Sequence, residues 1–122
     1  MDNKRVEFLG SSYRDLLDMP EEVIDQFGFE LGLVQNDMTP EGAKPLTKTF
    51  ENGVWELRDS HDGDAYRAVY FLRHEDVVFV LHCFKKKSTK GGAIPAADKA
   101  TIDARLATAR SRIEQLRKDK AR

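Results

Sequence analysis

The chain has 122 residues, with 20 Lys and Arg against 21 Asp and Glu and a formal net charge of −1. This length predicts one compact domain over residues 1–122, with a core that needs neither a disulfide nor a metal. Cys83 is the only cysteine, which excludes an intramolecular disulfide and a multi-cysteine metal site and fits a reducing, cytoplasmic compartment. The longest apolar run, Val77–Leu81, is far short of the roughly 20 residues that span a bilayer, so we expect no membrane association.

The net charge hides a strong asymmetry along the chain. Residues 1–42 carry three basic and ten acidic groups, a net of −7, whereas residues 43–122 carry 17 basic and 11 acidic groups, a net of +6. Such a division predicts that one surface can meet a polyanion although the whole chain is nearly neutral. The acidic first third is either a solvated face or a surface for a basic partner.

The first third of the chain predicts a short strand and a helical hairpin. Val6–Leu9 is an apolar run that ends at Gly10 and suits a strand. A helix is expected from Ser12 to about Met19, and a second from Pro20 to about Asn36. The second has apolar residues at helical spacing, namely Ile24, Phe27, Leu31 and Val34.

The middle of the chain predicts a three-stranded antiparallel meander. Residues 37–53 contain Pro and Gly breakers and are expected to be irregular. The strands are expected at Val54–Asp59, Tyr66–Leu72 and Val77–Phe84, with an Asp-Gly turn between the first two. The third is apolar on both faces, which indicates a covered, central position.

A long helix is expected after Pro95, with one apolar stripe formed by Ile102, Leu106, Ala109, Ile113 and Leu116. Residues 117–122 form a basic tail that is expected to fray. The predicted fold class is therefore α+β: a small antiparallel sheet with an N-terminal helical hairpin and a long C-terminal helix, in the order β-α-α-β-β-β-α. We expect the helices on one face of the sheet, with a face or an edge left free.

Basic residues gather at the predicted strand ends and in the adjoining loops: Lys44, Lys48, Arg58, Arg67, Lys85, Lys86, Lys87 and Lys90. The hairpin should hold Arg58 near Arg67. We expect the end of the third strand to lie toward the far end of the second, so that side-chain reach and twist must bring the lysines onto the same surface. Arg binds phosphate in a bidentate manner, and a Lys crowded by other cations has a lowered pKa and can act as a general base. This set suggests RNA cleavage without a metal or other cofactor, with the RNA 2′-hydroxyl as the nucleophile.

Structural roles compete with each of these assignments. Residues 85–90 also suit a solvated loop, Arg58 also suits an ion pair with Glu56 or Asp59, and Arg67 suits a pair with the acidic turn. His82 is expected to be a hydrogen-bonded core residue and Cys83 a small buried hydrophobe. The aromatic residues Trp55, Tyr66, Tyr70 and Phe84 are expected in the core rather than in a base-stacking platform.

Two stretches resemble a known family. GVWELRDSHDGDAYRAVYF (Gly53–Phe71) followed by VVFVLHCFKKKSTK (Val77–Lys90) is similar to the RelE/HigB toxin superfamily, and most of all to its phage-derived, HigB-like branch. That branch has a W-E-L-R strand, a Y-R-x-x-Y strand and an apolar strand ending in Lys-Lys. An A-x-x-R element follows in the last helix, here Ala107–Arg110 or Ala109–Arg112.

The resemblance implies the toxin of a type II toxin–antitoxin pair, typically an mRNA endoribonuclease that acts with the ribosome. The implied protein partner is an antitoxin, commonly with a helix-turn-helix domain. By position, Arg58 and Arg67 match the motif arginines and Lys85 and Lys86 the basic pair, so phosphate binding and transition-state stabilisation are expected of these four. Lys44, Lys48, Lys87 and Lys90 are expected to bind RNA.

The sequence also departs from the family pattern. Glu56 stands on the first meander strand, where the best-known members carry additional lysines, and the last helix offers no Tyr or His as a general acid. The general acid and base are therefore unassigned. Two further readings stay open. One is a non-catalytic RNA- or ribosome-binding module, such as a phage-derived regulator with the same basic surface. The other is a partner-binding protein whose acidic first third is the interface.

Overall fold

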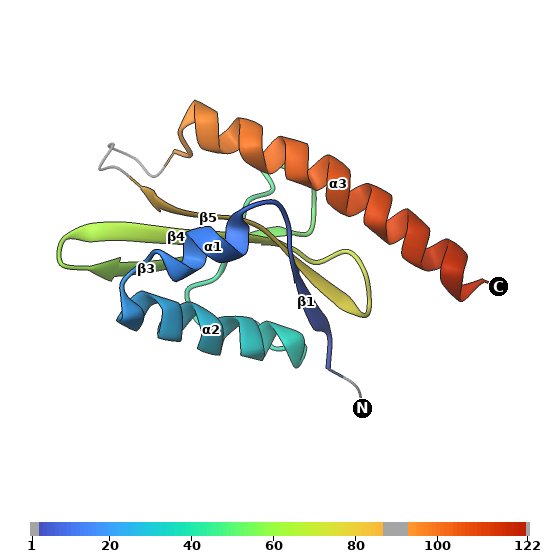
Figure 1. The fold of residues 1–122 in the computed structure, drawn as a ribbon, viewed down its shortest axis with the longest axis horizontal. Helices are drawn as coiled ribbons and strands as arrows, with labels where there is room; N and C mark the ends of the chain where they lie inside the picture. Colours follow the sequence, from blue (N-terminus) through green and yellow to red (C-terminus); the bar gives the residue numbers. More distant parts are fainter. Residues whose placement is uncertain (1–2, 87–92, 122) are drawn as a thin grey trace.

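The computed structural model describes residues 3–86 and 93–121 of the chain. Figure 1 shows one sheet between helices on its two sides. In chain order the elements are β1 (Arg5–Phe8), α1 (Ser12–Leu17), α2 (Glu21–Gln35), β2 (Lys44–Pro45), β3 (Val54–His61), β4 (Asp64–Phe71), β5 (Val77–Lys86) and α3 (Ala96–Lys120). No helix among the described residues is both long enough and apolar enough to cross a membrane.

The predicted α+β class is confirmed, and the strand order of the sheet is β1-β5-β4-β3-β2. The meander β3-β4-β5 is antiparallel as expected. The sheet is mixed, however, because β1 pairs in parallel with β5. A parallel pair needs a long connection, and here the whole segment from α1 to β4 supplies it. β2 was not expected, since it has two residues and one of them is Pro45, a residue tolerated only at an edge like this one.

Helices cover both faces of the sheet, which corrects the expectation that they share one. α1 and α2 lie on one side and α3 on the other (Figure 1). Alternating strand residues therefore face two cores: Leu57 and Tyr70 pack with α1 and α2, whereas Val69 and Phe79 pack with α3. β5 contributes to both cores, which explains why its sequence is apolar without alternation.

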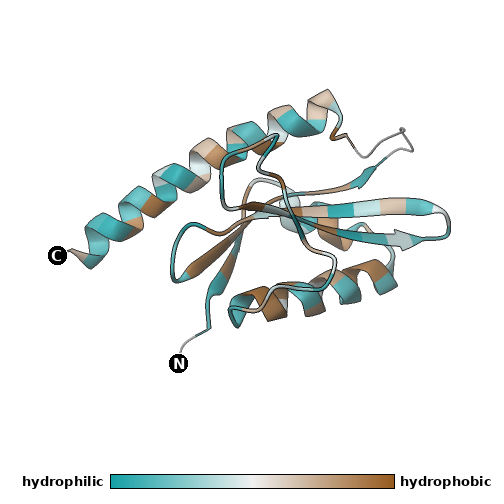
Figure 2. Ribbon diagram, turned by 180° about the vertical axis from the view of Figure 1, so that it is seen from behind, coloured by the Kyte–Doolittle hydropathy of each residue, from teal (hydrophilic) through white to brown (hydrophobic). Residues whose placement is uncertain are grey.

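The apolar stripe of α3 is confirmed. Ile102, Leu106, Ala109 and Ile113 are buried, and Leu116 packs against the same core. The rest of the helix is hydrophilic, so the apolar positions stand as separate bands along it in Figure 2. α3 extends through Lys120. Lys120 Nζ donates to Glu75 Oε1 (3.3 Å) and Asp76 Oδ2 (2.8 Å) in the β4–β5 turn, which gives the end of the helix a partner.

Arg105 joins α3 to the turn between β1 and α1. Its guanidinium donates to the Leu81 carbonyl at 2.9 Å and to Ser11 Oγ at 3.1 Å. Gly10 has φ +55°, and a Cβ there would lie 2.5 Å from Arg105 Nε. Glycine is therefore favoured at this turn by its backbone conformation, and any larger residue would require the Arg105 guanidinium to shift.

Candidate functional site

The strand register brings three of the predicted site residues to one end of the sheet. Arg58 on β3 stands directly opposite Arg67 on β4, and Arg67 stands opposite Phe84 on β5. Lys86 pairs with Ala65, next to this position. The end of β5 therefore lies beside the start of β4, not toward its far end as expected, because antiparallel neighbours run in opposite directions.

Glu56 holds the two arginines together. Its side chain is fully buried, with an exposed fraction of 0%. Arg58 Nε donates to Glu56 Oε1 in a short contact, and Arg67 Nη1 donates to Glu56 Oε2 at 2.9 Å. The pairing of Arg58 with Glu56 is confirmed, whereas the expected pairing of Arg67 with the acidic turn is replaced by Glu56. We refer to Glu56, Arg58, Arg67 and Lys86 as the strand-end cluster.

Lys86 is the third cation of the strand-end cluster. It is only 7% exposed. Burial lowers the pKa of Lys86, and the positive charges of Arg67 and Arg58 lower it further, while Glu56 opposes them. Among the described residues no carboxylate lies within ion-pair distance of its ammonium group. A lysine in this environment gives up its proton more readily than an exposed one, which is the property required of a general base.

Arg67 and Arg58 differ in their access to a ligand. Arg67 is 3% exposed, and burial lowers the pKa of its guanidinium, partly offset by the charge of Glu56. The Arg58 side chain is 41% exposed. Its Nε is engaged by Glu56, and a guanidinium has further N–H donors on its terminal nitrogens that can bind a phosphate. Arg58 is therefore the arginine that can meet a large ligand without rearrangement.

The other predicted residues are not members of the cluster. Lys85 points to the face that carries α1 and α2, where Nζ lies 3.0 Å from Asp64 Oδ2, and this hydrogen bond raises the pKa of Lys85. Lys44 on β2 is exposed and stands opposite Glu56 at the edge of the sheet, and Lys48 is exposed in the following turn. Lys87 and Lys90 lie outside the described residues. The structure thus groups Arg58, Arg67 and Lys86 and separates Lys85 from them.

His82 lies on the same face as the strand-end cluster, and both its ring nitrogens are engaged. Nε2 is 2.7 Å from Asp98 Oδ1 on α3, and Nδ1 is 3.4 Å from Arg105 Nη1. The ring of Phe84 stacks on the imidazole with centroids 4.7 Å apart. His82 is thus the hydrogen-bonded core residue that the sequence predicted. The neighbouring Cys83 is buried, as expected, and burial raises the pKa of its thiol to about 12.

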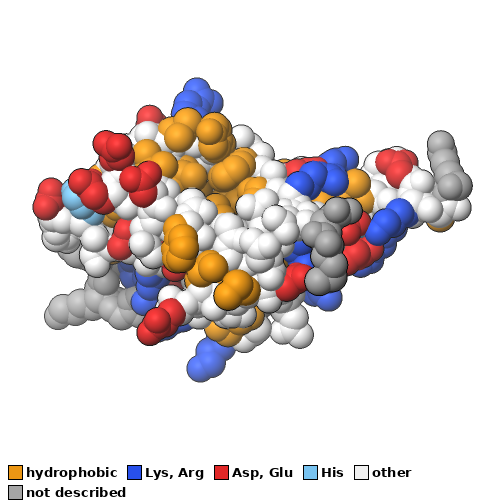
Figure 3. Space-filling view, turned by 90° about the horizontal axis from the view of Figure 1, so that it is seen from below, with side chains coloured by type: hydrophobic (Ala, Val, Ile, Leu, Met, Phe, Trp, Pro, Cys, Tyr) orange, Lys and Arg blue, Asp and Glu red, His pale blue; other side chains and the backbone are white. Residues whose placement is uncertain are grey.

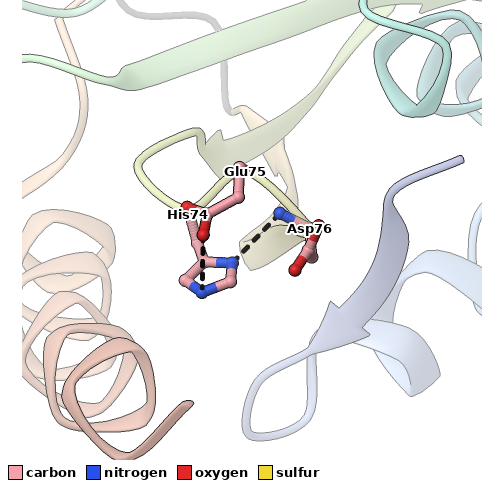
Figure 4. Close-up of side chains that lie close together, drawn as sticks. All are labelled: His74, Glu75 and Asp76. Carbon is pink, nitrogen blue, oxygen red and sulfur yellow. Dashed lines mark hydrogen bonds and ion pairs between the residues drawn. The ribbon is translucent and has the colours of Figure 1, made fainter. Parts of the chain in front are cut away.

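Within residues 3–86 and 93–121, one group has metal-ligand atoms close together: His74, Glu75 and Asp76 in the β4–β5 turn. Figure 4 shows the Asp76 backbone N–H donating to His74 Nδ1, at 3.0 Å. A neutral imidazole must then carry its proton on Nε2, so neither nitrogen offers a free lone pair. Lys120 already binds both carboxylates. This group is a structural link to α3 and does not fit a metal site.

Two residues that shape this region have roles that the sequence did not predict. Glu56 was expected as a partner for Arg58, whose strand face it shares, and as a departure from the family pattern, but not as the partner of Arg67. Arg105 was not identified, because nothing in the helical pattern separates it from the other arginines of α3. Its partners become visible only when β5 and the β1–α1 turn are placed beside the helix.

The comparisons with known proteins identify a family. The model of the phage-derived Gp49-like proteins (DUF891) matches residues 14–107, which include all the strands of the meander. The chain belongs to this family. The phage-derived character that the strand motifs indicated is thus confirmed.

Among solved structures, the chain is similar to a chain of the toxin–antitoxin complex RelBE2 from Mycobacterium tuberculosis. The two are 22% identical, the match covers 70% of this chain and 100% of that chain, and the TM-score is 0.46. The comparison with curated proteins gave no match.

Proposed function

We propose that this Gp49-like protein is the toxin of a type II toxin–antitoxin pair and that it cleaves mRNA in association with the ribosome. The observation that carries the proposal is the strand-end cluster, in which Arg58 and Arg67 bind the Glu56 carboxylate and Lys86 stands beside them. Within the cluster the cations outnumber the anion. This composition suits a phosphodiester and the additional negative charge of its transition state.

The roles follow from exposure and charge. Arg58, the more exposed arginine, binds the scissile phosphate, and the buried Arg67 adds positive charge behind Arg58. Lys86 takes the proton of the 2′-hydroxyl, whose oxygen then attacks the adjacent phosphorus and displaces the 5′-oxygen of the next nucleotide. Glu56 is a positioning residue, because it orients both arginines without facing the ligand. Lys44 and Lys48, exposed at the β2 side, bind flanking phosphates.

The proposed protein partner is an antitoxin, which keeps the enzyme inactive until the antitoxin is removed. The family membership and the cluster support this proposal together. A neighbouring gene for a short helix-turn-helix protein is the expected genetic context, and its co-expression should suppress any toxicity of this chain.

Expression of the chain alone in a bacterial host tests the proposal. The wild-type protein is expected to arrest growth, and primer extension on an abundant message after brief induction should show new 5′ ends. Arg58→Ala should lose both effects, because it removes the exposed phosphate ligand while Arg67 still partners Glu56. Arg14→Ala is the matched control: it removes one exposed arginine from α1, on the opposite side of the sheet.

The results separate the proposal from its alternative. New 5′ ends with wild type and Arg14→Ala, and none with Arg58→Ala, would support cleavage at the strand-end cluster. Salt-sensitive association with ribosomes but no new 5′ ends would instead favour the non-catalytic binding module. Arrest that persists unchanged in Arg58→Ala would show that the cluster is not the site.

A further inference from the structure

A pocket of about 360 Å³ lies beside α2, on the side of the sheet away from the strand-end cluster. It is formed by one flank of α2 and the loop that follows it, and its lining residues are Gln26, Phe29, Glu30, Leu33, Pro40 and Glu41. Figure 3 shows this side of the molecule, where hydrophobic side chains gather in the middle with charged ones around them. The proposed ribonuclease chemistry does not use this region.

Glu30 is an unusual group in the wall of the pocket. It is 5% exposed, and its Oε1 is buried without a hydrogen-bond partner among the described residues. Burial raises the pKa of the carboxyl group, and the charge of Asp59 raises it further, while a hydrogen bond from Gln26 opposes them. A buried carboxylate oxygen that lacks a donor is costly, so a ligand that brings a donor to it gains this interaction at the site.

The rim of the pocket is apolar and exposed. Phe29 is 64% exposed. A side chain of this size is usually buried, and here it stands at an opening that is also lined by Glu30 and Glu41. A ligand that fits must therefore combine a positive charge with apolar surface.

The charge of the surrounding chain points to the same ligand. The first 42 residues, which include α2 and all the lining residues of the pocket, carry a net charge of −7. Glu21, Glu22 and Asp25 are exposed along α2 before the pocket. An acidic surface of this kind attracts a basic partner and repels nucleic acid.

We propose that this pocket binds an arginine side chain from a partner protein, in a segment where apolar residues flank the arginine. A guanidinium can donate to the Glu30 carboxylate while its plane stacks on the exposed ring of Phe29, which an ammonium does less well. The flanking apolar residues cover the exposed ring of Phe29. The partner and an RNA bound at the strand-end cluster occupy opposite sides of the sheet, so they do not compete for the same atoms.

The probe is the tripeptide acetyl-Leu-Arg-Leu-amide, with the citrulline and lysine versions as comparisons. Citrulline has the shape of arginine without its charge. Binding to the full chain at pH 7.5 is followed by NMR, through the methyl groups of Leu33 and the ring of Phe29. The variants are Glu30→Gln and Glu41→Gln, and Glu21→Gln is the control, since it removes an exposed glutamate of α2 outside the pocket.

The arginine peptide is expected to shift the Phe29 and Leu33 signals and to bind about tenfold more tightly than the citrulline peptide. Glu30→Gln should lose this preference, Glu41→Gln should weaken binding without changing the fold, and Glu21→Gln should behave as wild type. Arg58→Ala should also bind normally, which separates this site from the proposed nuclease. Equal binding of the citrulline or lysine peptide, or an unchanged arginine preference in both Glu30→Gln and Glu41→Gln, would overturn the proposal.

Discussion

Replacement of Glu56 by Gln is the sharpest perturbation of the strand-end cluster. The substitution keeps the shape of the side chain but removes the charge that Arg58 and Arg67 share. Glu56 is fully buried, and Arg67 is 3% exposed, so water cannot replace the lost carboxylate around that guanidinium. The amide of Gln also presents N–H donors to a guanidinium that has only donors.

The expected loss in the free energy of unfolding is about 3–5 kcal/mol, the range found when one partner of a buried ion pair is removed. Natural domains are stable by about 5–15 kcal/mol, so the variant should lie near the limit of folding. Glu51→Gln is a matched control, because Glu51 also bridges two arginines, Arg73 and Arg110, but at the surface. Its expected cost is below about 1 kcal/mol.

Urea unfolding followed by the fluorescence of Trp55, the only tryptophan and the neighbour of Glu56 on β3, measures both variants. The second substitution Arg67→Met in the Glu56→Gln background should restore part of the stability, since it removes the cation that lost its carboxylate. A loss below about 1 kcal/mol in Glu56→Gln, or no recovery with Arg67→Met, would refute the shared-carboxylate account.

Three further predictions follow from the same structure. In NMR titrations the pKa of Lys86 should lie below 10.5, the ordinary value for a lysine. Arg58→Ala should raise the pKa of Lys86 because a repelling charge is removed, and an unchanged pKa would contradict the proximity of the two side chains. The raised pKa of Glu30 means that the folded state binds more protons than the unfolded state, so wild-type stability should fall as pH rises from 4.5 through the folded pKa. Glu30→Gln should not show this fall. If the free energy of unfolding in urea changes with pH equally in the two proteins, this prediction is refuted. Gly10→Ala should lower the free energy of unfolding by about 1–3 kcal/mol, because of its positive φ and the contact with Arg105; a neutral effect in urea unfolding would exclude that contact.

The periodicity of the sequence predicts most of the fold. The stripe of α3 and the three strands of the meander lie where the pattern places them, because each buries its apolar positions on a sheet face. The pairing of β1 with β5 could not be predicted, since a parallel partner is distant in the chain and leaves no local signal. The position of α3 on the face opposite α1 and α2 was not predicted either, because the strands that it covers are also distant in the chain and leave no local signal.

The candidate site is predicted only in part. The hairpin turn puts Arg58 opposite Arg67, so their proximity follows from the sequence. Lys85 and Lys86 are adjacent on β5, so only one of them can face α3. Which one does depends on the alternation of side chains along β4 and β5, and the irregular register between Val69 and Tyr70 affects this alternation. Clusters such as this one therefore become visible only when the strands are assembled.

Cleavage by the purified protein is the most direct test of the central claim. Wild type, Arg58→Ala and Arg14→Ala are incubated with ribosomes engaged on a defined message, and primer extension maps the 5′ ends. The account predicts new ends with wild type and Arg14→Ala and none with Arg58→Ala. Equal cleavage by Arg58→Ala, or no cleavage by a folded wild-type protein on translating ribosomes, would contradict it.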